Sequence, residues 1–193
     1  MEGLELIKKI VSDELCELAG AVMGTNFLEE SKPLSEYNDE EYDGDFTFSE
    51  DGAVFAENGR CFYILLEDGS IGCADADYYE CGRVAENMVE FLEILLNTAY
   101  CWQNYLTDTD KPLDKSGVAA WESKGREQFA KVYGNELPPY DEAAKAVAER
   151  FGLRIIEDIT EELMPKLYKT MNREPLFAVS IDGWGELSLV GKD

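Results

Sequence analysis

The feature that most constrains the fold is a series of short apolar runs between residues 46 and 74. The turns between these runs contain Asp-Gly or Asn-Gly, which readily adopt the positive φ angles that tight hairpins need. The pattern therefore predicts an antiparallel β-meander. The run at 61–66 is apolar at every position, so we expect a central strand covered on both faces. The runs cover residues 46–48, 53–57, 61–66 and 71–74.

Helical periodicity on both sides of the meander completes an α+β pattern, with helices packed on the sheet. Apolar residues at steps of three and four predict an amphipathic helix before Gly24, and a strongly apolar stretch at 83–97 predicts a buried helix. An acidic segment with Pro33 and no apolar periodicity predicts a solvated loop. We expect one domain, 1–193, with an N-terminal helix at 3–23, an acidic loop at 29–45, the meander at 46–74, helices within 83–171 and a C-terminal hairpin at 176–190.

Local signals predict several helix ends. Ser116 and Asp141 are candidate N-caps, and Asp158 followed by Glu161 has the spacing of a capping box. Gly152 is a candidate helix stop, and Pro165 should shorten or kink the helix that contains it.

The chain is strongly acidic. It has 41 Asp and Glu against 17 Lys and Arg, a formal net charge of −24, and 24 of the acidic residues fall in the first hundred positions. Such a surface repels phosphate backbones and anionic lipids, so we expect neither nucleic-acid nor membrane binding. It would attract a basic protein and speed its association at low salt. Solubility alone is the alternative explanation of the charge.

The absence of histidine removes whole classes of chemistry. Ser-His and Cys-His nucleophile pairs, helical His-Glu-x-x-His zinc sites and imidazole pH switches are all excluded. The five cysteines form no Cys-x-x-Cys pair, which argues against structural zinc and favours reduced thiols. The N-terminal segment does not resemble a signal peptide and no apolar run reaches 18 residues, so we expect a cytoplasmic protein.

Carboxylates are the remaining catalytic candidates. A glycosidase needs two of them in a cleft, and close pairs are expected by chance in so acidic a chain. Neither EF-hand spacing nor a glycine-rich nucleotide motif is present, so no cofactor is predicted. Cys81 lies near Arg83 and before the predicted helix, which fits an activated thiol or a small buried residue. The acidic clusters are Asp39, Glu40, Glu41, Asp43 and Asp45; Asp75, Asp77 and Glu80; and Asp108, Asp110 and Asp114.

Aromatic residues lie next to one of these clusters. Tyr78 and Tyr79 stand between Asp77 and Glu80. Large amphipathic rings beside charges are typical of protein-interface hot spots, although such tyrosines also anchor half-buried loops. Trp102 fits either an interface or the core.

Residues 52–106 contain a characteristic succession of parts. They are a strand running into 66–72, a loop ending in Glu80-Cys81-Gly82-Arg83-Val84-Ala85, an apolar helix from Met88 to Leu96, and Tyr100-Cys101-Trp102. In this order the parts resemble the SUKH superfamily, whose bacterial members include many immunity proteins of toxin systems and are similar to fungal cell-wall-synthesis regulators. The order of the parts carries the resemblance, since each part is common. The chain lacks the proline-led N-terminal segment of many members.

The resemblance implies a twisted antiparallel sheet with helices against it, and binding without catalysis. With the charge, it favours an immunity protein that neutralises a basic, nuclease-like toxin. A carboxylate- or cation-dependent hydrolase and a regulatory domain without a toxin partner remain alternatives. The predicted partner-binding residues are Asp39, Glu40, Glu41, Asp43, Asp45, Asp75, Asp77, Tyr78, Tyr79 and Glu80.

Overall fold

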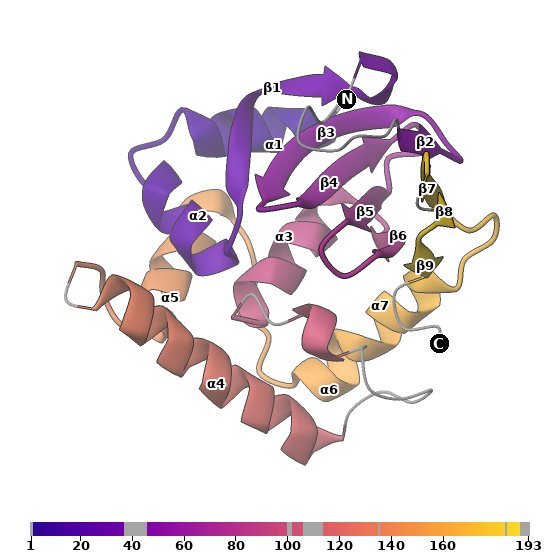
Figure 1. The fold of residues 1–193 in the computed structure, drawn as a ribbon. Coiled ribbons are helices and arrows are strands. Elements are labelled where there is room, and N and C mark those ends of the chain that lie inside the picture. The colour runs from indigo at the N-terminus through magenta and orange to yellow at the C-terminus, as the bar shows by residue number, and fades with distance from the viewer. Residues whose placement is uncertain are drawn as a thin grey trace.

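A six-stranded sheet forms the centre of the molecule (Figure 1). The structure, a computed structural model, describes residues 2–36, 46–99, 102–105, 114–134, 136–183 and 185–189. The first five strands in the spatial order are antiparallel neighbours, and the last joins β6 in parallel. The predicted meander is confirmed for its last three runs, which form the consecutive strands β3, β4 and β5. In that order the strands are β1 (Asn26–Pro33), β3 (Gly52–Asn58), β4 (Cys61–Leu66), β5 (Ile71–Asp75), β6 (Glu80–Ala85) and β9 (Ser188–Leu189).

Helices pack on one face of this sheet and a small antiparallel sheet covers the other. The small sheet has the order β2 (Phe46–Phe48), β7 (Val179–Ile181) and β8 (Gly185–Glu186). The arrangement confirms the α+β class. The helices are α1 (Glu2–Val11), α2 (Cys16–Met23), α3 (Met88–Asn97), α4 (Lys115–Tyr133), α5 (Tyr140–Phe151), α6 (Ile159–Glu162) and α7 (Met164–Met171), with short 3-10 helices η1 (Leu34–Glu36) and η2 (Trp102–Tyr105).

Strand β4 contributes side chains to the two hydrophobic clusters, one on each face of the main sheet. Its six residues are all buried, as expected for a central strand. Tyr63 and Leu65 belong to the cluster under the helices, whereas Phe62 and Ile64 belong to the cluster under the small sheet. Because alternate side chains of a strand point to opposite faces, a strand covered on both sides must be apolar throughout.

Two contacts show how closely the layers approach. On β5, a Cβ added at Gly72 would lie 3.0 Å from the ring of Phe177, so a larger residue there would push against that ring. On the helix side, Trp102 is 2% exposed and its Nε1 donates to the Tyr63 hydroxyl at 3.2 Å. Trp102 is therefore a core residue.

The predicted helix at 3–23 is wrong in one respect, because it is two helices, α1 and α2. The side chains between them bond to the backbone and compete with helical hydrogen bonds. Ser12 Oγ donates to the Lys8 carbonyl at 2.8 Å, and Asp13 Oδ1 accepts from Leu15 N at 3.0 Å. The predicted stop is confirmed, since Gly24 caps α2 in the left-handed conformation at φ 61°.

Two assignments around the predicted acidic loop at 29–45 are also wrong. Residues 26–33 form β1, an edge strand whose register against β3 is interrupted between Phe27 and Lys32. Because of that interruption and of the charged side chains of β1, the sequence lacks the two-residue alternation that would have predicted a strand. The run at 46–48 leaves the meander and pairs with β7 instead.

The helix predicted at 83–97 begins later. Residues 80–85 form β6, which pairs with β5, and α3 begins at Met88. Asn87 is the N-cap, and its side chain accepts from Glu90 N at 3.0 Å. A short apolar run fits a strand or a helix turn equally well, so periodicity alone did not separate the two.

The other helix ends are partly as predicted. Asp158 caps α6 by accepting from Glu161 N, Gly152 ends α5 at φ 73°, and Pro165 lies in the first turn of α7, which separates it from α6. The predicted cap Ser116 is wrong, because Asp114 caps α4 and Ser116 Oγ donates to its carboxylate. Asp141 lies inside α5 rather than at its cap.

A buried arginine joins the main sheet to its surroundings. Arg83 on β6 is 2% exposed, and its guanidinium donates to Ser70 Oγ at 3.0 Å, to the Pro175 carbonyl and to Glu50. These partners come from three separate segments of the chain. A buried guanidinium requires this many acceptors, because each unpaired N–H would cost free energy.

Within the described ranges, no helix is both long enough and apolar enough to cross a membrane.

Candidate functional site

The turn between β5 and β6 carries the predicted residues that the structure describes. Asp75, at the end of β5, is 3% exposed. Its Oδ1 accepts from Asp77 N at 3.0 Å and from Tyr78 N at 3.1 Å. Its Oδ2 accepts from Gln103 Nε2 at 2.6 Å, which ties the turn to η2. The buried carboxylate therefore fixes the backbone of the turn from beneath.

The two tyrosines project from this fixed backbone. Tyr78 is 71% exposed and Tyr79 is 46% exposed. Tyr79 adopts φ 57°, in the left-handed region that non-glycine residues rarely occupy. Local strain of this kind persists only where the surrounding contacts hold it. The turn thus presents two large rings in an imposed conformation.

The neighbouring β3–β4 turn braces the same region. Ala76 N donates to the Arg60 carbonyl at 3.1 Å, and the Arg60 guanidinium lies 3.5 Å from the Asp77 carboxylate. Glu80 is half-buried at the start of β6, where the backbone pairs with Ser188 of β9. Carboxylates therefore stand on both sides of the tyrosines.

The structure brings Asp75, Asp77, Tyr78, Tyr79 and Glu80 into one turn. Asp75 is too buried to contact a partner, and its role in the turn is to position the others. The remaining predicted residues lie outside the part of the chain that the structure describes, so their role stays a prediction. They are Asp39, Glu40, Glu41, Asp43 and Asp45.

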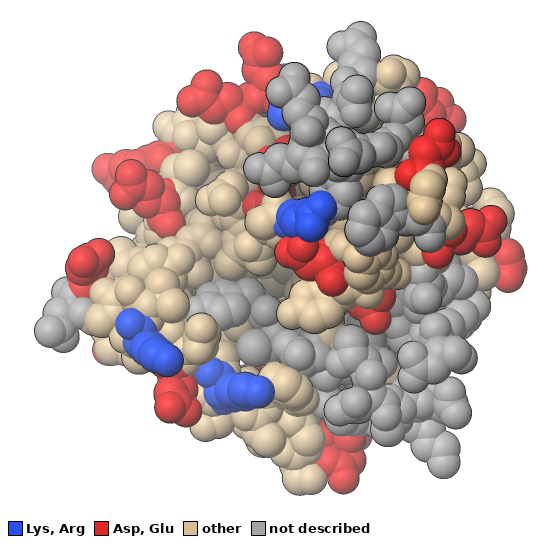
Figure 2. Space-filling view, in the orientation of Figure 1, with Lys and Arg blue, Asp and Glu red and all other residues tan. Residues whose placement is uncertain are grey.

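Acidic side chains are distributed over the visible face of the molecule rather than gathered in one field (Figure 2). Basic side chains are sparser on that face and lie over α4 and over the region of the strands. On this face the charge therefore supplies a general negative potential, and it does not by itself mark one site. The exposed Tyr78 and Tyr79, in contrast, distinguish one turn from the rest of this acidic surface.

The described thiols are poor nucleophiles. Cys81 is buried inside β6 rather than at a helix start, and burial raises the pKa of its thiol to about 11. Cys61 and Cys73 lie with their sulfurs 3.3 Å apart in the core, and the hydrogen bond between them and burial both raise the pKa of Cys73. Because the thiolate is the reactive form, the raised pKa values disfavour Cys73 and Cys81 as nucleophiles at neutral pH.

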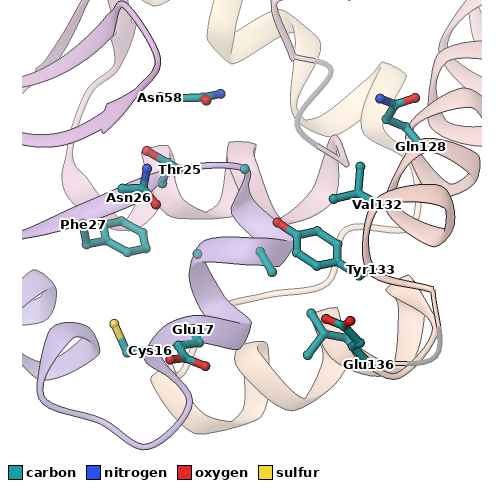
Figure 3. A pocket seen from close by; sticks show the side chains of 14 residues that line it. Cys16, Glu17, Thr25, Asn26, Phe27, Asn58, Gln128, Val132, Tyr133 and Glu136 are labelled. Atoms are coloured by element: carbon teal, nitrogen blue, oxygen red, sulfur yellow. The ribbon is translucent and has the colours of Figure 1, made fainter.

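Among the described residues, no group of three or more Cys, Asp or Glu side chains is arranged to hold a metal ion. A cavity of about 660 Å³ lies between α2, the start of β1 and the C-terminal end of α4 (Figure 3). Of the three acidic clusters predicted from the sequence, no member within the described ranges lines it. Sequence reasoning missed it because its walls come from segments around residues 16–27, 58 and 128–137.

Comparison with protein-family models, with curated proteins and with solved structures finds no match to this chain.

Proposed function

We propose that this chain is a non-catalytic protein-binding domain, and that the β5–β6 turn contacts a basic protein partner. The observation that carries the proposal is the pair of exposed tyrosines, Tyr78 and Tyr79, on a turn held by the buried carboxylate of Asp75. Two adjacent exposed aromatic rings offer a partner a large area to bury on binding.

Tyrosine suits such a contact for energetic reasons. It buries a large area while only two side-chain torsions lose freedom, so ordering it costs little entropy. A turn whose backbone is already fixed loses still less freedom on binding. Residues of this kind, placed at the centre of an interface, contribute much of its binding free energy.

The charges around the tyrosines favour a basic partner. Asp77 is exposed beside them, and the whole chain has a net charge of −24. Complementary charge speeds encounter and rejects acidic competitors, while the rings determine how long the complex lasts. The narrower proposal, an immunity protein that covers a nuclease-like toxin, rests on the resemblance to the SUKH superfamily. A toxin that grips phosphate presents the basic surface that this account requires.

Capture from the cells that produce the chain tests the proposal. The immobilised protein is compared with the double variant Tyr78→Ser/Tyr79→Ser and with Val89→Ser, a control that removes a different exposed apolar side chain. We expect a basic protein that wild type and control retain, that the double variant loses, and that high salt releases.

Thermal unfolding of the three proteins shows that each is folded before capture. If every retained basic protein binds the double variant as well as it binds wild type, the turn is not the binding surface. If no basic protein is retained, the negative charge serves another purpose and the proposed partner class is wrong.

A further inference from the structure

The cavity between α2 and α4 is a second place where the surface is shaped for a ligand. Its volume, about 660 Å³, falls in the range of small-molecule sites. One wall is α2 with the start of β1, the other is the end of α4, and Asn58 of the β3–β4 turn closes one side (Figure 3). The Tyr133 ring extends from α4 toward α2 with its hydroxyl foremost.

Polar side chains from three elements line this cavity. Asn26 of β1, Asn58 of β3 and Gln128 of α4 are exposed to solvent, and Tyr133 of α4 is half-buried. Their amides and hydroxyl can therefore exchange water for the polar groups of a ligand.

Apolar surface lies between these polar groups. Phe27, Val132 and Leu137 line the cavity together with the Tyr133 ring. Val132 is 59% exposed, so its side chain is open to a ligand in the cavity. A ligand with an apolar body would cover this surface and release its hydration water.

The charge of the lining is of one sign. Glu17 and Glu136 are the charged lining residues, and no lysine or arginine of the described ranges joins them. Cys16 also lines the cavity, and burial, with smaller contributions from the carboxylates of Glu17 and Asp13, raises the pKa of its thiol. An anionic ligand would be repelled here and a cation attracted.

We infer that this cavity binds a small organic cation, an ammonium group carried on an apolar body. The carboxylates of Glu17 and Glu136 attract the ammonium group, the amides and the Tyr133 hydroxyl orient the polar end, and Phe27, Val132 and Leu137 cover the apolar body. Both aromatic rings also favour a cation over their faces. The inference is independent of the protein-binding role of the β5–β6 turn.

A matched set of three compounds tests the charge preference. Benzylammonium, benzyl alcohol and benzoate share one ring and differ in the charge of the substituent. Each is titrated into the ¹⁵N-labelled full chain at low salt, with amide resonances followed by NMR. We expect benzylammonium to shift resonances of residues 16–27 and 128–137 with a saturable curve, and to bind at least about fivefold tighter than the other two.

Variants then locate the ammonium group. Glu17→Gln and Glu136→Gln should each weaken benzylammonium binding about two- to fivefold, the range expected for exposed ion pairs. Glu127→Gln, on the exposed face of α4 and outside the lining, should leave the affinity unchanged.

Three results would overturn the inference. The first is benzoate binding as tightly as benzylammonium, and the second is equal affinity in all three variants. The third is saturating benzylammonium that shifts no resonance of the cavity segments. Exposed Glu to Gln changes preserve the fold, so an altered affinity reports on the site.

Discussion

Arg83 shows at the scale of one residue how a charge is accommodated in this core. Its guanidinium reaches Ser70, Glu50 and the Pro175 carbonyl, and its side chain is almost completely buried. Arginine fits because its planar fork offers donors in several directions at once. Lysine, a single point charge, could not satisfy all three acceptors.

Replacing Arg83 with alanine should destabilise the fold strongly, because Glu50 would keep its charge in a largely buried position without a partner. We expect the free energy of unfolding to fall by about 3 kcal/mol, which for a chain of this size lowers Tm by roughly 6–12 °C. Lys145→Ala, which breaks the exposed pair with Glu149, is the control and should change Tm by less than about 1 °C. Similar Tm values for the two variants in a calorimetric scan would refute the role given to Arg83.

Glu90 gives the opposite case, a charge in an unfavourable place. Its Oε1 is buried without a hydrogen-bond partner in the described structure, and burial raises the pKa of its carboxyl. Lys166 and a backbone hydrogen bond from Glu86 oppose this rise, and the negative charges of Glu86 and Glu93 add to it. A raised pKa in the folded state means that folding favours the protonated form. The resulting stability is present below the unfolded pKa and is lost as pH rises through the folded pKa.

Glu90→Gln should therefore stabilise the protein at neutral pH, with a Tm increase of about 1–3 °C at pH 7. The difference from wild type should vanish at pH 4, where the wild-type carboxyl is itself largely protonated. Parallel thermal scans at the two pH values measure this. A gain of the same size at both would show that the charge of Glu90 is not its cause.

At the scale of elements, the sequence predicted the turns, strands and helix ends that are determined by neighbouring residues in the chain. Asn-Gly and Asp-Gly turns located the hairpins of β3, β4 and β5, because positive φ at those positions is a local requirement. The apolar run of β4 predicted burial on both faces. Gly24 and Gly152 marked helix ends for the same local reason.

Elements that depend on distant partners were not predictable in this way. The strand β6 and the first turn of a helix share one apolar pattern, and pairing with β5 decides between them. Likewise β2 resembles a meander strand but pairs with β7, more than 130 residues later. Nothing in the sequence of β2 indicates that it pairs with β7.

At the scale of the whole molecule, the two candidate surfaces differ in how far the sequence alone could predict them. The residues of the β5–β6 turn are consecutive, so Tyr78 and Tyr79 with their flanking acids could be found by reading along the chain. What the sequence could not show is that Asp75 is buried and fixes the turn. The cavity joins segments more than 100 positions apart, and only folding places Glu17 and Glu136 in the lining of one cavity.

The central claim is that the β5–β6 turn binds a basic protein. In this account charge sets the association rate, and the tyrosines set the dissociation rate. The most direct measurement is the kinetics of the captured partner binding to wild type, Asp77→Asn and Tyr78→Ser at low and high salt. Asp77→Asn should lower the association rate at low salt with little effect on dissociation, and Tyr78→Ser should speed dissociation about tenfold or more at both salts. Rate constants that are the same for all three proteins would contradict the account.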